Sequence, residues 1–173
     1  MGCVFGAHLL HIILGKRFYE EPDELMMEYS FKIIGVIHSP YTDKVQTPIQ
    51  PTRSQAVGRV EIDAAYAEGL RGLDGFSHII LLYVFHQSEG YRLQVQPFLD
   101  DELHGLFATR HPCRPNPIGI SIVRLLACHD NILDIEGVDV LDGTPLLDIK
   151  PYVPDFDVRT EVSTGWYAQR SKE

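Results

Sequence analysis

The chain has 173 residues, of which 45% are hydrophobic, 10% aromatic and 23% charged. This composition is typical of one soluble globular domain and excludes a disordered, collagen-like or membrane-embedded chain. The 15 basic and 24 acidic residues give a formal net charge of −9, which speaks against nucleic-acid binding by bulk electrostatic attraction. At this length folding buries roughly two-thirds of the surface of the unfolded chain, so stability requires no disulfide, metal or cofactor.

The first 30 residues differ from the rest of the chain, and we predict that 1–30 form an extension outside the fold. Residues 1–14 are apolar, but they are too few to span a bilayer, and no basic segment or obvious cleavage site marks a signal peptide. Met26 and Met27 stand directly before the first strand-like run, so either is a candidate start of the natural protein. We expect no membrane association; an anchor through residues 1–14 is the alternative.

The cysteines and histidines show no metal-binding pattern. Cys3, Cys113 and Cys128 are odd in number and form no Cys-x-x-Cys pair, so neither a disulfide framework nor a zinc site is predicted. The eight histidines are scattered, without a His-Glu-x-x-His motif. We therefore predict a protein of the reducing cytoplasm that holds no metal ion.

Short β-branched runs separated by turn signals follow one another from residue 31 onwards. The runs that we predict to be strands are 31–38, 58–63, 76–85, 91–98, 118–127, 132–136, 138–141 and 146–152. The run at 76–85 is nearly without polar residues, which suits a central strand covered on both faces. A short helix is predicted at 64–69.

These runs predict a mainly-β fold, a single small β-barrel of about seven strands with long functional loops and one or two short helices. A sandwich of the same strands is the alternative. The chain has no internal repeat and no composition break. We therefore place one barrel domain at 31–153 and a C-terminal tail at 154–173.

Two segments between the predicted strands are rich in proline. Residues 41–55 hold Pro48 and Pro51 and show no apolar periodicity, which predicts a loop. Residues 108–119 place three prolines within six positions, a density that excludes a regular element. Long loops in compact domains are uncommon and often functional, so both segments are candidates for a site.

The charge distribution is uneven along the chain. No acidic residue lies between Glu102 and Asp130. This stretch carries Arg110, Arg114 and Arg124. It indicates either a local cationic site or a neutral packed segment with three solvated arginines.

Polar residues at the ends of the predicted strands suit a polar or zwitterionic, nucleoside-like ligand. Arg110 and Arg114 provide planar donors for a carboxylate or phosphate. Gln50 and Gln87 can pair with an amide or adenine edge, and Asp142 can accept from an ammonium or a ribose hydroxyl. Because a barrel gathers its loops at its two ends, such residues can converge on one pocket.

Each of these groups also has a purely structural interpretation. Arg110 and Arg114 can cap backbone carbonyls or pair with Asp148, and 142–145 can be no more than a hairpin turn. The sequence contains no Gly-x-Ser-x-Gly, P-loop or Rossmann motif, and no close acidic pair suited to glycoside chemistry. A hydrolase is therefore not indicated.

Taken together, several strings are more specific than any one of them. They are GVIHSPY at 35–41, Gln50-Pro51, DGFSHI at 74–79, FHQ at 85–87, FATRHPCRPNPIGIS at 107–121 and DGTPLLDIKPY at 142–152. In this order and rough spacing they resemble the TsaA-like (TrmO) family of tRNA methyltransferases. The resemblance covers residues 31–153.

The resemblance implies an S-adenosylmethionine-dependent methyltransferase built on a single β-barrel and acting as a homodimer. The expected substrate is tRNA carrying N6-threonylcarbamoyladenosine at position 37, methylated on N6. The resemblance also implies contacts with the methyl donor, among them an arginine of the TR-x3-R run. The implied contact positions are Pro48, Ile49, Gln50, His86, Gln87, Arg110, Arg114, Ile120, Asp142, Gly143, Thr144 and Pro145.

Two features depart from the family pattern. Members commonly have Pro-Arg-Gln where this chain has Pro48-Ile49-Gln50, so one potential cationic contact with the donor or the tRNA is missing. Members similar to the enterobacterial enzyme continue into a further C-terminal domain after the barrel. We expect less surface for gripping tRNA without it.

The implied reaction is an in-line displacement in which the protein acts mainly by positioning. His86, Asp148, Tyr152 or solvent can accept the proton that leaves the substrate nitrogen. Arg110 and Arg114 would hold the donor carboxylate, the substrate carboxylate or the tRNA backbone. The alternatives are another RNA base or a small molecule as acceptor, or a non-catalytic module that binds S-adenosylmethionine or a nucleotide.

Overall fold

A computed structural model describes residues 28–48, 50 and 54–169. The chain divides into two units, Met1–Ser30 and Phe31–Glu173, and the second contains every strand and helix given below. The predicted extension therefore lies largely outside the described residues, as does Ile49. Across the described part of the chain, no helix is long and apolar enough to cross a membrane.

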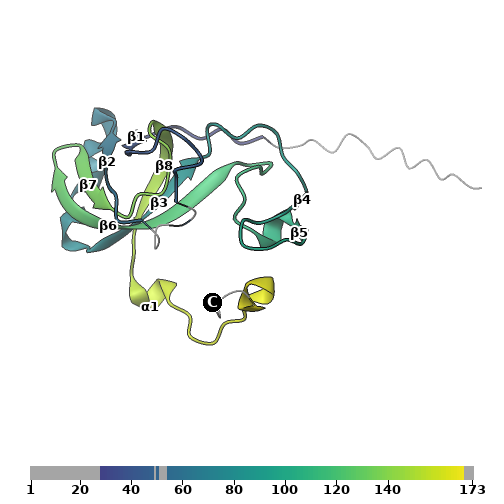
Figure 1. The fold of residues 1–173 in the computed structure, drawn as a ribbon. Helices are drawn as coiled ribbons and strands as arrows, with labels where there is room; N and C mark the ends of the chain where they lie inside the picture. The colour runs from purple at the N-terminus through teal and green to yellow at the C-terminus, as the bar shows by residue number, and fades with distance from the viewer. Residues whose placement is uncertain (1–27, 49, 51–53, 170–173) are drawn as a thin grey trace, which may run out of the picture. The chain divides into compact units, whose positions relative to one another are not determined.

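Six strands of the described residues close into a barrel (Figure 1). They are β1 (Gly35–His38), β2 (Val57–Ile62), β3 (His78–Val84), β6 (Ile118–His129), β7 (Ile132–Glu136) and β8 (Thr144–Pro151). Their order around the barrel is β1-β2-β7-β6-β3-β8, and every neighbouring pair is antiparallel. Closure removes the free sheet edges at which chains aggregate. The prediction of a mainly-β barrel is confirmed.

The barrel core comes from the alternation of side chains along each strand. In β2, β3 and β6 every second residue points inward and is buried, as the period of two requires. Ile37, Val60, Ile79, Leu133 and Leu146 have no exposed surface. Burying each such side chain contributes about 1.5–3 kcal/mol to stability.

Three predicted strands differ in the structure. The run at 76–85 was expected to be covered on both faces, but the outward residues of β3 are partly exposed because a barrel strand has an outer face. Within 91–98 only β4 (Gln94–Val95) is a strand, and it pairs with β5 (His104–Gly105) in a separate small sheet. Residues 138–141 are not a strand; they cover the barrel, with Val138 and Val140 buried.

Short helices occupy the connections. The helix predicted at 64–69 is the 3₁₀ helix η2 (Ala64–Leu70), which begins where Asp63 Oδ1 accepts a hydrogen bond from the Ala65 amide at 2.9 Å. The remaining described helices are η3 (Leu73–Gly75), η4 (Leu106–Ala108), α1 (Pro154–Asp157) and η5 (Gly165–Gln169). Each spans at most two turns, so most of the framework is β-structure.

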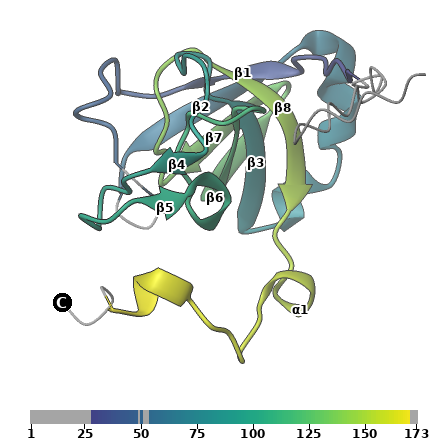
Figure 2. The same cartoon turned by 90° about the vertical axis from the view of Figure 1, so that its right-hand side faces the viewer.

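Because neighbouring strands are antiparallel, each connection between consecutive barrel strands lies at one of the two ends of the barrel. One end, here called the loop end, carries the three segments 39–56, 85–117 and 137–143. The other, here called the turn end, carries residues 63–77 and the β6–β7 turn, and β8 leaves the barrel there. Figure 2 shows β3 and β8 side by side, with β8 leading into the C-terminal segment. The two proline-rich segments thus share the loop end.

Candidate functional site

Arg110 and Gln50 meet at the loop end, although 60 positions separate them in the sequence. The Arg110 guanidinium donates from Nη1 to Gln50 Oε1 at 2.8 Å. The arginine is exposed and the glutamine half-buried, so the remaining N–H groups of the guanidinium are open to a ligand. Two residues predicted to bind a nucleoside-like ligand are therefore in contact.

A second contact joins the same two segments. Lys44 Nζ donates to the backbone carbonyl of Gln87 at 2.8 Å. Both His86 and Gln87 are exposed, and the chain turns sharply here because the His86 amide donates to the Val84 carbonyl at 2.8 Å. Gln87 thus lies beside the segment that holds Pro48 and Gln50.

Arg114 has a different role from Arg110. Its Nη1 donates to the backbone carbonyl of Thr109 at 3.0 Å and to that of Leu106 at 3.4 Å. The guanidinium also lies over the Phe107 ring, 5.7 Å from the ring centre. The carbonyl-capping interpretation therefore applies to Arg114, which shapes the loop that presents Arg110.

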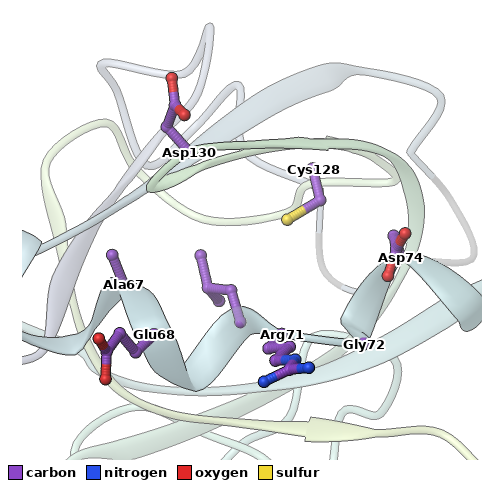
Figure 3. A pocket seen from close by; sticks show the side chains of 8 residues that line it. Ala67, Glu68, Arg71, Gly72, Asp74, Cys128 and Asp130 are labelled. Carbon is purple, nitrogen blue, oxygen red and sulfur yellow. The ribbon is translucent and has the colours of Figure 1, made fainter.

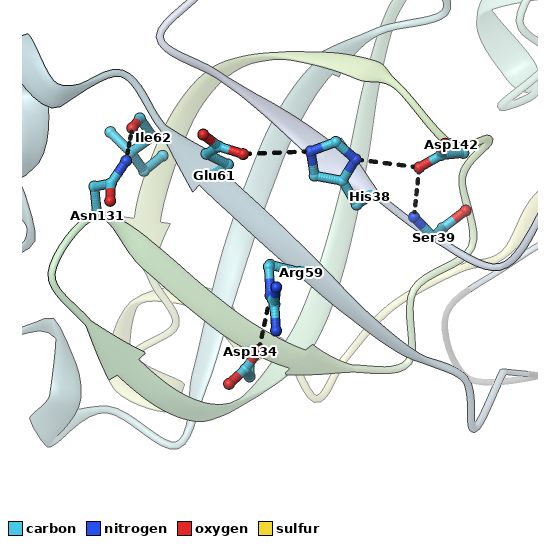
Figure 4. Close-up of polar contacts among 8 residues, drawn as sticks. All are labelled: His38, Ser39, Arg59, Glu61, Ile62, Asn131, Asp134 and Asp142. Atoms are coloured by element: carbon cyan, nitrogen blue, oxygen red, sulfur yellow. Dashed lines mark hydrogen bonds and ion pairs between the residues drawn. The ribbon is translucent and has the colours of Figure 1, made fainter.

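Asp142 and the turn that follows it are tied to the end of β1 (Figure 4). The Asp142 Oδ1 atom accepts from the Ser39 amide at 3.1 Å and lies 3.3 Å from His38 Nδ1. Gly143 adopts φ 75°, a left-handed conformation that favours glycine. Thr144, the first residue of β8, donates from Oγ1 to the Leu141 carbonyl at 2.7 Å, and Pro145 follows it in the strand. The turn is therefore rigid, and the Asp142 carboxylate stays half exposed.

The arginines of the stretch without acidic residues lie in two different surroundings. Burial and then the nearby charges of Arg92 and Arg114 lower the pKa of His111, so these cations gather on the 85–117 segment. Arg124, in contrast, forms an ion pair with Glu136, Nη1 to Oε2 at 3.3 Å, on the outer barrel surface. Arg110 and Arg114 thus lie at the loop end, whereas Arg124 is paired on the outer surface.

Three predicted positions lie away from this group. Ile120 faces outward from β6, 45% exposed, beside its β3 partner Leu82. Asp148 is the partner of Leu82 on the other side and forms a 2.8 Å ion pair with Lys150. Tyr152 lies at the turn end, where its amide donates to the His78 carbonyl at 3.1 Å. Of the three candidate proton acceptors, only His86 is at the loop end.

A buried polar network missed by the sequence analysis lies inside the loop end. Ser121 Oγ donates to Asp139 Oδ1 at 2.5 Å and is 3.1 Å from Tyr83 Oη. Tyr83 and Ser121 are each 3% exposed. A serine at an inward position of the apolar run 118–127 is the signal that could have revealed the network.

Gly119, in the Pro-Ile-Gly run, makes room for the network. A Cβ atom built on Gly119 would lie 2.2 Å from Tyr83 Cε2, a distance that no side chain tolerates. The Tyr83 ring therefore lies directly over the Gly119 backbone, with its edge toward the Phe85 ring at 5.4 Å. The glycine thus serves close packing, since its φ is not in the left-handed region.

The network changes the acidity of its members. Burial raises the pKa of Asp139 from 3.8 to about 6, although the Ser121 hydrogen bond and the Arg110 charge act in the opposite direction. Burial and the Asp139 charge raise the pKa of Tyr83 well above its usual range. Tyr83 is therefore neutral at physiological pH, while Asp139 titrates just below neutrality.

A separate hollow of about 600 Å³ lies at the turn end (Figure 3). It is lined by Ala67, Glu68, Leu70, Arg71, Gly72, Asp74, Cys128 and Asp130. Burial, together with the Asp74 charge, raises the pKa of the Cys128 thiol. None of the residues predicted to bind a ligand lines this hollow, so we place the candidate site at the loop end. Among the described residues no group of His, Cys, Asp and Glu side chains is arranged to hold a metal ion.

Comparison with known proteins gives the family. Residues 36–158 match the family model described as the tRNA-methyltransferase O N-terminal domain. The chain belongs to this family. The matched residues include the barrel from the second residue of β1 onwards and all three segments of its loop end.

Two relatives place the chain within the tRNA-methyltransferase O family. A probable S-adenosyl-L-methionine-binding protein of Pyrococcus abyssi is 53% identical over 137 residues, which cover 79% of this chain and 74% of that protein. The tRNA (adenine(37)-N6)-methyltransferase of Escherichia coli is 43% identical over 155 residues, which cover 83% of this chain and 66% of the enzyme.

A solved structure of the same family has the same fold. TrmO from Pseudomonas aeruginosa superimposes with a TM-score of 0.69 at 39% identity, covering 81% of this chain and 63% of that one. The chain thus spans just under two-thirds of the length of this TrmO and of the E. coli enzyme. The resemblance predicted from the sequence motifs is confirmed.

Proposed function

We propose that the protein is an S-adenosylmethionine-dependent methyltransferase that methylates N6 of adenosine 37 in tRNA. The observation that carries the proposal is the meeting of Gln50 and Arg110 at the loop end, the end of the barrel that also carries the Asp142 turn. The three segments that carry the family motifs supply these residues. The similarity to the E. coli tRNA (adenine(37)-N6)-methyltransferase and to the probable S-adenosyl-L-methionine-binding protein of Pyrococcus abyssi supports the same activity.

The chemistry of the loop-end residues fits the methyl donor. The exposed guanidinium of Arg110 matches a carboxylate, and the half-exposed Asp142 carboxylate accepts from ribose hydroxyls or an ammonium. Gln50 and Gln87 carry amides that suit an adenine edge. When bound, S-adenosylmethionine supplies an activated methyl group on a sulfonium sulfur. The loops then contribute chiefly by holding the acceptor nitrogen in line with that group.

Within this proposal each residue at the loop end has a separate role. Arg110 binds a carboxylate, and Arg114 keeps the loop of Arg110 in shape through its bonds to Thr109 and Leu106. Of the three candidate proton acceptors, only His86 lies at the loop end. We therefore assign this role to His86. Asp148 and Tyr152 are left out because they lie on the outer surface and at the turn end.

We propose further that the acceptor is N6-threonylcarbamoyladenosine. The support is the family resemblance and the cluster of Arg92, Arg110 and Arg114 on one segment, which suits the added carboxylate of that nucleoside and the nearby phosphates. A tRNA acceptor is met in the cytoplasm, where we place the protein.

A homodimer is part of the proposal. Ile118, Ile120 and Ile122 are 40%, 45% and 44% exposed and form an apolar row along the outer face of β6. The adjoining outward residue of β3, Leu82, extends the row. A second copy covering this row would bury Ile120, the one implied donor contact that faces outward. An Ile122→Lys variant should then sediment as a monomer where the unaltered protein is a dimer.

The decisive experiment is a methyl-transfer assay. The purified full chain is incubated with labelled S-adenosylmethionine and total tRNA from cells with and without the threonylcarbamoyl modification, and the nucleosides are analysed by mass. Transfer to the modified tRNA alone is expected. Transfer to both preparations would contradict the proposed substrate, and absence of donor binding in calorimetry would contradict the proposed activity.

A second candidate function is donor binding without transfer. It is favoured by the similarity to the Pyrococcus relative, which is described as a probable S-adenosyl-L-methionine-binding protein. In that case the assay would show a bound donor that is never consumed with either tRNA preparation.

A further inference from the structure

Phe107 is a large apolar side chain that the fold holds in solvent. It is 75% exposed, although both of its neighbours in η4 are held in place. Leu106 is buried, and its carbonyl accepts from the Thr109 amide at 3.0 Å and from Thr109 Oγ1 at 2.8 Å. The Ala108 carbonyl accepts from Trp166 Nε1 at 2.8 Å. The exposure of Phe107 is therefore built into the local structure.

The Arg114 guanidinium covers one face of the Phe107 ring. Its central carbon lies 5.7 Å from the ring centre, and its Nη1 atom donates to the carbonyls of Thr109 and Leu106. These bonds hold the guanidinium on one side of the ring. Because Phe107 is so largely exposed, the opposite face of the ring is open to solvent. An open aromatic face beside a fixed cation is suited to the stacking of a nucleobase.

Two backbone hydrogen bonds bring a second arginine to the same place. The Leu106 amide donates to the Leu93 carbonyl at 2.9 Å, and the Arg92 amide donates to the Cys113 carbonyl at 3.3 Å. The stretch of Arg92 therefore lies against both η4 and the loop of Arg114. Among the described residues neither arginine forms an ion pair with a carboxylate. Both charges thus remain available to phosphate groups.

The acidic residues of this region lie at the other end of the small sheet of β4 and β5, which stands apart from the barrel strands (Figure 1). Asp101 and Glu102 are exposed in the connection between the two strands. Phe98 is in the same connection and is 80% exposed. The 85–117 segment thus presents one exposed phenylalanine with arginines and another with acidic residues. Only the surroundings of Phe107 attract a polyanion.

The occupant that fits the Phe107 surface is an unpaired base of an RNA. Sites for small molecules such as the methyl donor enclose most of the ligand surface, whereas the Phe107 ring stands in solvent. Unpaired bases in RNA loops are recognised by stacking on aromatic rings, and arginines bind the neighbouring phosphates. Adenosine 37 of tRNA lies in the anticodon loop, so unpaired nucleotides flank the proposed target.

We propose that Phe107, backed by Arg114, is the platform on which the protein stacks a nucleotide next to the target adenosine. The inference rests on the proposed function and adds a positioning residue for its RNA substrate. Stacking on Phe107 fixes the RNA relative to Arg110, three positions further along the chain. Arg92 and Arg114 hold the phosphates beside the stacked base. Phe107 thus acts on the RNA and makes no contact with the donor.

The test measures RNA binding by the full chain. The probes are two synthetic anticodon stem-loops that contain N6-threonylcarbamoyladenosine, with the fluorescent base 2-aminopurine before it in one RNA and after it in the other. Stacking on Phe107 should change the fluorescence of one of these bases. Phe107→Ala should remove the change and weaken RNA binding by about tenfold or more. Phe107→Trp keeps an aromatic face and should bind within about threefold of the unaltered protein.

Further variants separate stacking from other roles of the ring. Phe98→Ala is the matched control, because Phe98 is at least as exposed but stands with acidic residues; it should bind RNA as the unaltered protein does. Phe107→Leu keeps an apolar side chain without an aromatic face and should behave like Phe107→Ala. Arg92→Gln should reduce the slope of log affinity against log salt concentration by about one. Circular dichroism establishes that each variant is folded, and calorimetry should give the same affinity for S-adenosylmethionine throughout.

The outcomes separate this inference from the proposed function. Unchanged RNA binding by Phe107→Ala, or an equal loss in Phe98→Ala, would overturn the platform. So would a loss of donor affinity in Phe107→Ala, which would place the ring in the donor site, or a change from dimer to monomer in sedimentation, which would place it between two copies. RNA binding that depends on Phe107 without methyl transfer would contradict the proposed activity and leave the platform standing. Donor binding by an unaltered protein that binds neither RNA would overturn both the platform and the tRNA substrate.

Discussion

Both ends of the barrel carry polar side chains, but the surroundings of these side chains differ between the two ends. At the loop end Tyr83 and Ser121 are buried, and Ser121 bonds to both Tyr83 and the half-buried Asp139. At the turn end Glu68 and Asp74 line an open hollow and face solvent (Figure 3). Water screens charges at the turn end, whereas the enclosed groups act on one another and on Arg110. The two ends therefore differ in how far their polar groups are coupled: the loop end joins a buried network to the exposed Arg110, and the turn end presents separate side chains to solvent.

The largest effect should come from a methyl group added at the loop end. Gly119→Ala forces Cβ into the Tyr83 ring, because the closest ring atom would be 2.2 Å away, and should lower the free energy of unfolding by about 3 kcal/mol or more. The matched change at the turn end, Gly75→Ala, meets open space and should alter it by no more than about 0.5 kcal/mol. Urea unfolding followed by fluorescence compares the two. Similar losses at both glycines would remove the contrast between the ends.

Replacing the buried charge should stabilise the protein at neutral pH. The pKa of Asp139 is raised in the folded state, from 3.8 to about 6. The contribution of the protonated Asp139 to the free energy of unfolding is therefore fully present below pH 3.8. It is lost as the pH rises through about 6. At pH 8 the ionised carboxylate costs up to about 3 kcal/mol, a cost that Asp139→Asn removes.

The measurement is the thermal unfolding of this variant and of the unaltered protein from pH 4 to pH 8. The difference between them should grow with pH and be smallest at pH 4. Asp134→Asn is the control, because the side chain of Asp134 is on the outer surface. A difference that is constant with pH would contradict the raised pKa of Asp139.

Removing the loop-end cation should weaken ligand binding without unfolding the barrel. Arg110→Gln keeps a hydrogen-bonding side chain near Gln50 but loses the charge, and it should reduce the affinity for S-adenosylmethionine about tenfold. The pKa of Asp139 should rise further, since the Arg110 charge lowers it. Calorimetry measures the first effect, and carbon-13 NMR of the carboxyl group measures the second. Arg124→Gln, on the outer surface, is the matched control; an equal loss of affinity there would refute a specific role for Arg110.

The smallest effect concerns the C-terminal segment, which starts at the turn end yet contacts the 85–117 segment. Trp166 Nε1 donates to the Ala108 carbonyl at 2.8 Å, and its ring stacks on His104 with centres 4.8 Å apart. Trp166→Ala should loosen this contact by about 1 kcal/mol and leave global stability nearly unchanged. Hydrogen exchange should become faster at residues 104–110. Unchanged exchange at those residues would show that the C-terminal segment does not restrain the approach to Arg110.

The sequence alone identified much of the fold and a large part of the candidate site. Alternating apolar residues predicted the barrel strands, because a strand with one face in the core must alternate. The error at 138–141 arises because a short apolar run can pack on the barrel core without pairing in the sheet. Within 91–98 only Gln94–Val95 pairs, and its partner is β5 in a separate small sheet. The motif strings led to the family and to Gln50, Arg110 and Asp142.

The tertiary structure decided which of these residues meet. Periodicity does not reveal that Gln50 and Arg110 touch across 60 positions, nor that Tyr152 ends at the opposite end from Asp142. Asp139 stands in the run 138–141, which the sequence predicted to be a strand. Its partial burial, raised pKa and bond to Ser121 arise only when the barrel closes and the 137–143 segment folds over it. Local patterns determine strands, because side-chain direction depends on neighbours in the chain. The site depends on which loops share an end and on what they exclude from water, and barrel closure sets both.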